Sequence, residues 1–93
     1  MVLMPYIEEQ RQELLRKYQQ LLQMPFTTSG GEQIDNLYDL EIGQIERQLL
    51  RCAGITRDEI DWISALKKAR NSLSHLEPVD ASVLTSILQR VDE

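Results

Sequence analysis

The sequence predicts an all-α fold, an antiparallel four-helix bundle formed by a single domain over residues 1–93. Apolar residues recur at helical spacing in four stretches, and no stretch shows the alternation typical of a half-buried strand. The links between the last three stretches are short, which favours antiparallel neighbours. With 42% hydrophobic and 27% charged residues, a chain of this length can build one modest core.

The first helix is predicted over residues 5–23. Pro5 suits the first helical residue, where its missing N–H has no helical partner in any case, and Glu8 and Glu9 are placed to meet the positive end of the helix dipole. Pro25 ends the pattern, and the glycine-containing stretch behind it is typical of a loop. The apolar face consists of Ile7, Leu14, Leu15, Tyr18, Leu21 and Leu22.

The second helix is predicted over residues 32–53. Ser29 and Glu32 have the spacing of a capping box, and Asp35 and Asp39 are alternative caps. The apolar face is wider than one bundle seam needs, which predicts a further contact such as a dimer interface. Its residues are Ile34, Tyr38, Ile42, Ile45, Leu49 and Cys52, widened by Leu37, Leu40 and Leu50.

Two glycines mark this second helix. Gly43 lies inside it and costs about 1 kcal/mol relative to Ala, so we expect another backbone to approach closely there. Gly54 suits the position just past a helix end, which favours positive φ.

The third and fourth helices are predicted over residues 57–76 and 81–92. Thr56 and Glu59 form a capping box for the third, and Asp80 caps the fourth. The seam of the third helix is Trp62, Leu66, Ala69, Leu73 and Leu76. The fourth helix carries Val83, Leu84, Ile87, Leu88 and Val91.

Charge and cysteine content exclude several classes of function. The net charge of −5 argues against binding of polyanions by the whole surface. One cysteine and one histidine cannot form an intrachain disulfide or a zinc site, so no metal or cofactor is predicted. No signal peptide and no apolar run of membrane-spanning length is recognisable, so we expect no membrane association and a cytoplasmic location.

One segment departs from this acidic balance. No acid occurs between Trp62 and Leu76. The segment carries Lys67, Lys68 and Arg70 together with His75, which predicts a local cationic surface for an anionic ligand. The alternative is a solvated helix face whose positive charges complement the helix dipole.

The spacing of the polar residues in this segment suggests how they interact. Asn71 and His75 are four residues apart, so the amide can hydrogen-bond the ring and set its tautomer. Arg70 and Ser74 have the same spacing. Arg70 and His75 are five residues apart, about 140° around a straight helix. Convergence of these two on one phosphate therefore requires a kink, an unwound last turn or a second subunit.

The run Arg70-Asn71-Ser72-Leu73-Ser74-His75 resembles the signature of the HEPN superfamily, an arginine followed by a polar residue and then a histidine. The preceding Trp62–Leu66, the following Leu76–Pro78 and the helical pattern from Leu37 onward add to this resemblance. It implies a four-helix bundle that forms a homodimer, with two motifs facing one cleft. Many members of the superfamily are metal-independent endoribonucleases that act as toxins or in defence.

The resemblance implies roles for the motif residues. His75 would move protons and Arg70 would bind phosphate, while Asn71 would orient His75 or contact RNA. Substrate binding would fall to Lys67, Lys68 and Ser74. RNA, a second copy of the chain and a cognate protein or antitoxin are the expected partners.

The alternative is a noncatalytic helical module for dimerisation or protein interaction. On that interpretation Trp62, Leu66 and Leu73 form core or interface, and Arg70 and His75 make structural hydrogen bonds. A serine hydrolase is disfavoured, since nothing resembles a nucleophile elbow.

Overall fold

A computed structural model describes residues 2–91 of the chain, which are mostly helical, as the all-α prediction requires. Two short strands pair antiparallel with Phe26 opposite Ile34. The elements in order are α1 (Leu3–Lys17), β1 (Phe26–Thr27), β2 (Gln33–Ile34), the 3-10 turn η1 (Leu37–Asp39), α2 (Ile42–Leu49), α3 (Arg57–Ser74) and α4 (Ala81–Val91).

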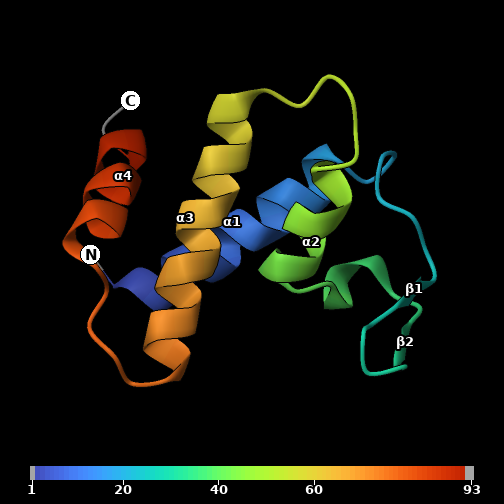
Figure 1. Ribbon diagram of the computed structural model, residues 1–93, viewed down its shortest axis with the longest axis horizontal. Helices are drawn as coiled ribbons and strands as arrows, with labels where there is room; N and C mark the ends of the chain where they lie inside the picture. The colour runs from blue at the N-terminus through green and yellow to red at the C-terminus, as the bar shows by residue number, and fades with distance from the viewer. Residues whose placement is uncertain (1, 92–93) are drawn as a thin grey trace.

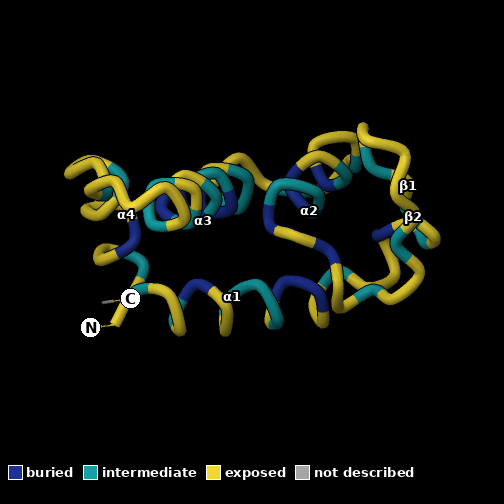
Figure 2. Tube along the Cα trace, turned by 90° about the horizontal axis from the view of Figure 1, so that it is seen from below, coloured by how far each residue is buried: buried dark blue, intermediate teal, exposed yellow. Residues whose placement is uncertain are grey.

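The helices form two layers. Helices α2, α3 and α4 lie side by side in one layer, and α1 runs across beneath them (Figures 1 and 2). Within the layer the chain direction alternates from α2 to α3 to α4, so these neighbours are antiparallel. The crossing of α1 differs from the expected four-helix bundle. Its link to α2 spans residues 18–41, and a connection of that length does not force the two helices to lie side by side.

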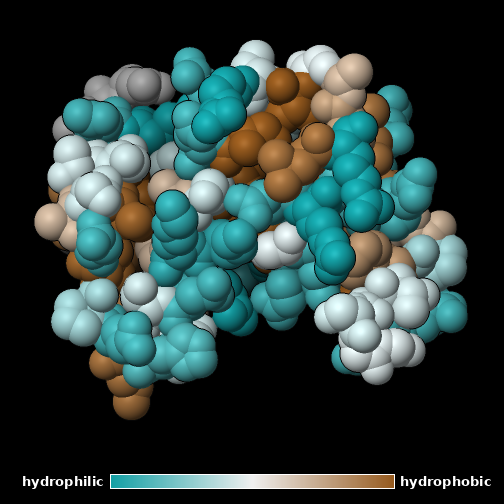
Figure 3. Space-filling model, in the orientation of Figure 1, coloured by the Kyte–Doolittle hydropathy of each residue, from teal (hydrophilic) through white to brown (hydrophobic). Residues whose placement is uncertain are grey.

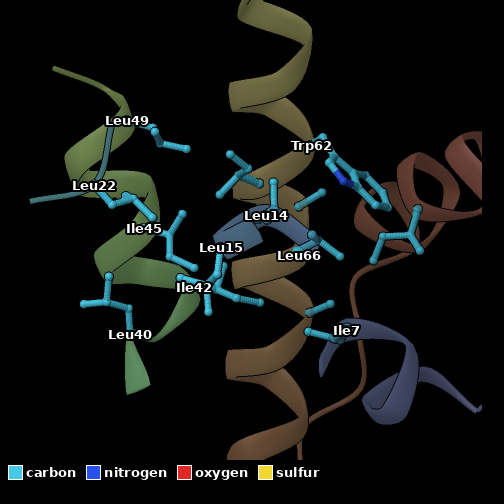
Figure 4. Packing of buried hydrophobic residues seen from close by; sticks show 14 residues of the cluster. Ile7, Leu14, Leu15, Leu22, Leu40, Ile42, Ile45, Leu49, Trp62 and Leu66 are labelled. Carbon is cyan, nitrogen blue, oxygen red and sulfur yellow. The ribbon is translucent and has the colours of Figure 1, made fainter. Parts of the chain in front are cut away.

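The core lies between the two layers, and side chains from α1, α2 and α3 point toward one another there (Figure 4). At the α4 end, Trp62 contacts Tyr6 edge-on with ring centroids 6.4 Å apart. The guanidinium of Arg90 lies 5.2 Å from the Trp62 ring centroid. The largest fully buried side chains are Ile7, Leu15, Leu40, Ile42, Ile45, Leu49, Ile63, Leu66 and Ile87.

Helix α1 begins at Leu3, two residues before the predicted start, so that Glu8 and Glu9 lie beyond its first turn. It ends at Lys17, earlier than the predicted end at residue 23. Beyond it, the N–H groups of Leu21 and Leu22 both donate to the carbonyl of Tyr18, which turns the chain. This turn buries Leu22 and leaves Leu21 exposed, whereas the predicted helix places both on its apolar face.

The predicted second helix over residues 32–53 is wrong at both ends, because α2 covers only Ile42–Leu49. Arg11 on α1 donates hydrogen bonds to the carbonyls of Tyr38 and Leu40, at 2.8 and 2.7 Å. Those carbonyls would accept from later N–H groups if the helix began earlier. A contact distant in sequence thus replaces the first turns of the expected helix with β2 and η1.

The start of α2 uses a cap that differs from the predicted ones. The side chain of Gln44 accepts a hydrogen bond from the N–H of Glu41, the N-cap residue. Ser29, Asp35 and Asp39 do not cap α2.

The apolar residues that widen the predicted second helix are mostly used inside the chain. Leu40 is completely buried, and Leu37 packs against the core from η1. Leu50 remains exposed. The surplus surface that motivated a dimer interface on this helix is therefore largely covered by the chain itself.

Gly43 approaches a side chain and not a backbone. A Cβ added there would lie 3.6 Å from Cδ of Lys67, an ordinary van der Waals contact. Gly54 has a φ of 93° in the turn that follows α2, as expected for a glycine past a helix end.

Helices α3 and α4 begin as predicted. Oγ1 of Thr56 accepts from the N–H of Glu59, and Oδ1 of Asp80 accepts from the N–H of Ser82. The predicted fourth helix extends to residue 92, which lies outside the described residues.

Helix α3 ends at Ser74 in a Schellman motif, shortly before the predicted end at residue 76. The N–H of Glu77 donates to the carbonyl of Ser72, and the N–H of Leu76 donates to that of Leu73. Leu76 has a φ of 56° at the position that usually holds glycine, and it is 94% exposed.

Candidate functional site

A groove between α2 and α3 brings together Lys67, Arg70 and Asn71, three of the six polar residues that the sequence indicates as site residues. Its hollow has a volume of about 260 Å³. Helix α3 contributes Lys67, Arg70 and Asn71 to its lining, and α2 contributes Arg47 with the polar Gln44. Figure 3 shows hydrophilic side chains over the lower part of the α2–α3 seam and apolar ones near its upper end.

Arg70 is held on the wall of the groove by two contacts. Its Nη2 lies 3.2 Å from Oε2 of Glu41. Its Nη1 donates to Oγ of Ser74 at 3.3 Å, as the four-residue spacing predicts. The side chain remains 37% exposed, so its fork is ordered and still open to a ligand.

Lys67 is fixed more firmly. Its Nζ lies 2.6 Å from Oε1 of Glu46, whose side chain is only 11% exposed. A carboxylate this far from water requires a charged partner, so the pair orders both side chains. Glu46 thus neutralises part of the cationic surface that the sequence of α3 predicts.

Asn71 and His75 do not form the predicted contact. Asn71 is exposed and lines the groove, while His75 is exposed at the C-cap of α3. Within residues 2–91 no hydrogen bond joins their side chains; the backbone N–H of His75 donates to the carbonyl of Asn71. Because α3 is helical throughout Arg57–Ser74, Arg70 and His75 do not converge within one chain.

Lys68 lies on another side of α3. It borders a hollow between α3 and α4, together with Ser64 and Ser82. The neighbouring lysines at 67 and 68 therefore belong to different surfaces, because consecutive helical positions are about 100° apart.

Arg47 is the one cationic groove residue that the sequence analysis did not single out. It follows Gly43 by four residues, so both lie on the side of α2 that faces Lys67. A basic residue one turn after a helical glycine is the signal that points to this position. Among the described residues, three cations therefore line the groove, against the single carboxylate of Glu41.

In the described part of the chain, no group of three or more histidine, cysteine, aspartate or glutamate side chains is placed to hold a metal ion. Over the same residues, no helix has the length and apolar character needed to cross a bilayer. Comparison with protein-family models, characterised proteins and solved structures finds no significant match.

Proposed function

We propose that the chain is a HEPN-like, metal-independent endoribonuclease domain that binds RNA along the α2–α3 groove and cleaves it at a site shared by two copies. The observation that carries this proposal is the meeting of Arg47, Lys67 and Arg70 with Asn71 in one hollow of an otherwise acidic chain. Phosphate contacts from arginine and lysine supply most of the affinity of such interfaces.

These residues need only transfer protons and stabilise charge, because the 2′-hydroxyl of RNA is itself the nucleophile. The 2′-oxygen attacks the adjacent phosphorus, its proton passes to one imidazole, and the bond to the 5′-oxygen breaks as a second imidazole donates a proton to that oxygen. Arg70 would bind the phosphate and stabilise the negative charge that develops on it. The ion pair to Glu41 and the hydrogen bond to Ser74 would keep its guanidinium oriented.

Two copies are part of the proposal because each chain has one histidine. His75 is exposed at the C-cap of α3 and is not among the residues that line the groove with Arg70. A second copy would bring its own His75 to the site, so that one imidazole acts as base and the other as acid.

Binding of a labelled single-stranded RNA, measured by anisotropy across a salt series, tests the groove. Arg47→Ala should weaken binding and lower the salt slope by about 0.7 to 1. Lys68→Ala removes the same charge from an exposed residue outside the groove and is the matched control. Equal losses in both variants would contradict binding in the groove.

The second candidate is a noncatalytic helical module that associates with a second copy through α4. Leu84, Leu88 and Val91 follow one another at helical spacing and are all exposed. Sedimentation at tens of micromolar tests this candidate. Leu84→Glu with Leu88→Glu should then dissociate a dimer, whereas Leu76→Glu, which places a charge at an exposed site off α4, should not. A parent chain that sediments as a monomer would exclude this candidate.

A further inference from the structure

A second hollow lies at the carboxyl end of α2, against the link between α1 and β1. Its volume is about 440 Å³, within the range of small-molecule sites. Arg47 and Arg51 line it from the end of α2, and the hydroxyl-bearing residues Thr27, Thr28 and Ser29 line it from β1 and the loop that follows. Among the residues that the structure describes, no carboxylate lines it.

The two arginines are unusual within this chain. Of its seven arginines, five have a carboxylate within 4 Å, and among residues 2–91 only Arg47 and Arg51 have none. Arg47 lies in the last turn of α2 and Arg51 in the turn that follows the helix, and both line this hollow. The two arginines without an acid among the described residues of this acidic chain therefore share one hollow.

The walls of this hollow are built from ordered parts. The side chain of Gln48 accepts a hydrogen bond from the N–H of Gln23 at 2.7 Å and donates one to the carbonyl of Gln23 at 3.4 Å. These two hydrogen bonds hold the segment between α1 and β1 against α2. Oγ1 of Thr28 accepts from the N–H of Glu32 at 3.1 Å, so its own proton is free to donate into the hollow. Ordering before binding reduces the entropy that a ligand must overcome.

The remaining surface of the hollow is apolar. Phe26 and Leu21 both line it, and Leu21 is substantially exposed. A ligand that fits has an anionic group for the two guanidinium groups and the hydroxyls, and a flat apolar group for the phenyl ring. We infer that this hollow binds a small organic phosphate, with the phosphate at Arg47 and Arg51 and the apolar part against Phe26.

Calorimetric titration with phenyl phosphate, with inorganic phosphate for comparison, tests this site. The full chain should bind phenyl phosphate saturably and more tightly than phosphate. Arg51→Gln should weaken binding at least about tenfold, because hydrogen bonds to charged groups are lost. Arg57→Gln is the matched control, since that arginine is exposed and lies at the start of α3. Absence of saturable binding, or equal losses in both variants, would overturn the inference.

Two further readouts locate the ligand. Cys52 also lines the hollow and is the only cysteine, so phenyl phosphate should slow its alkylation by N-ethylmaleimide several-fold. Phe26→Ala should remove the preference for phenyl phosphate over phosphate. If Arg70→Gln weakens binding as much as Arg51→Gln, the anion lies in the α2–α3 groove and the inference is wrong.

This inference does not rest on the proposed ribonuclease function. Arg51 lines only this hollow and Arg70 only the groove, so loss of one ligand leaves the other measurable. If the arginines instead only complement the dipole of α2, Arg51→Gln would lower the melting temperature and the parent chain would bind no phenyl phosphate.

Discussion

Arg70 is paired with Glu41, and this contact joins the motif arginine of α3 to the residue that caps α2. Nη2 of the arginine lies 3.2 Å from Oε2 of the glutamate, at an edge of the groove where both remain partly exposed. The pair therefore orders the guanidinium and also competes with any phosphate that binds it.

Glu41→Gln should therefore strengthen RNA binding, because Glu41 is the one carboxylate among the described residues that line the groove. The free energy of unfolding should fall by no more than about 1 kcal/mol, as is usual for exposed ion pairs. Anisotropy and thermal melts check both effects. Glu13→Gln breaks a comparable exposed pair on α1 and serves as control. Weaker RNA binding in Glu41→Gln would mean that orientation of Arg70 outweighs competition.

The pair between Lys67 and Glu46 should behave differently, because Glu46 is buried. Lys67→Met should lower the free energy of unfolding by about 1–3 kcal/mol, since it leaves a buried carboxylate without its partner. Adding Glu46→Gln should restore part of that loss. Chemical denaturation measures both changes. If Lys67→Met alone is as stable as the parent chain, the buried carboxylate of Glu46 does not depend on Lys67 as its partner.

Leu76→Gly should stabilise the chain by about 1 kcal/mol. A leucine with a φ of 56° is strained, and its side chain is almost fully exposed, so little packing is lost. Gly54→Ala, also at a positive φ, should show the opposite sign. Melting temperatures of the two variants check this contrast, and a lower value for Leu76→Gly would contradict it.

The start of α4 should loosen in acid. Hydrogen bonds from the side chain and then the backbone N–H of Ser82 lower the pKa of Asp80. The cap therefore contributes stability above the pKa of an unfolded aspartate, about 3.9, and loses it as the pH falls through the lower folded pKa. Amide exchange of α4 between pH 5 and 2 measures this. Asp80→Asn caps without titrating, so its α4 should lack this acid-dependent loosening.

The elements that were predictable from sequence depend on local chemistry. The seam of Trp62, Leu66 and Ala69 and the cap at Thr56 place α3 correctly, because both signals lie within the helix itself. The start of α2 was not predictable in this way. It depends on hydrogen bonds from Arg11 to carbonyls of residues 38 and 40, a contact between segments distant in the sequence.

In the candidate site, too, local contacts were predictable from the sequence and contacts between distant segments were not. The hydrogen bond between Arg70 and Ser74 follows from helical spacing, and the structure contains it. Which of Lys67 and Lys68 faces the groove depends on where α2 packs, and the sequence pattern alone treats them alike. The acids that pair with the cations of α3 come from α2 and its N-cap, namely Glu46 and Glu41.

Cleavage of a single-stranded RNA in the presence of EDTA tests the central claim most directly. The proposed mechanism predicts that the parent chain produces fragments ending in a 2′,3′-cyclic phosphate, and that His75→Ala abolishes them without changing the melting temperature. A DNA strand of the same base sequence should remain intact, because it lacks the 2′-hydroxyl that acts as the nucleophile. An RNA left uncleaved by the parent chain, or cleaved equally by His75→Ala, would contradict the proposed function.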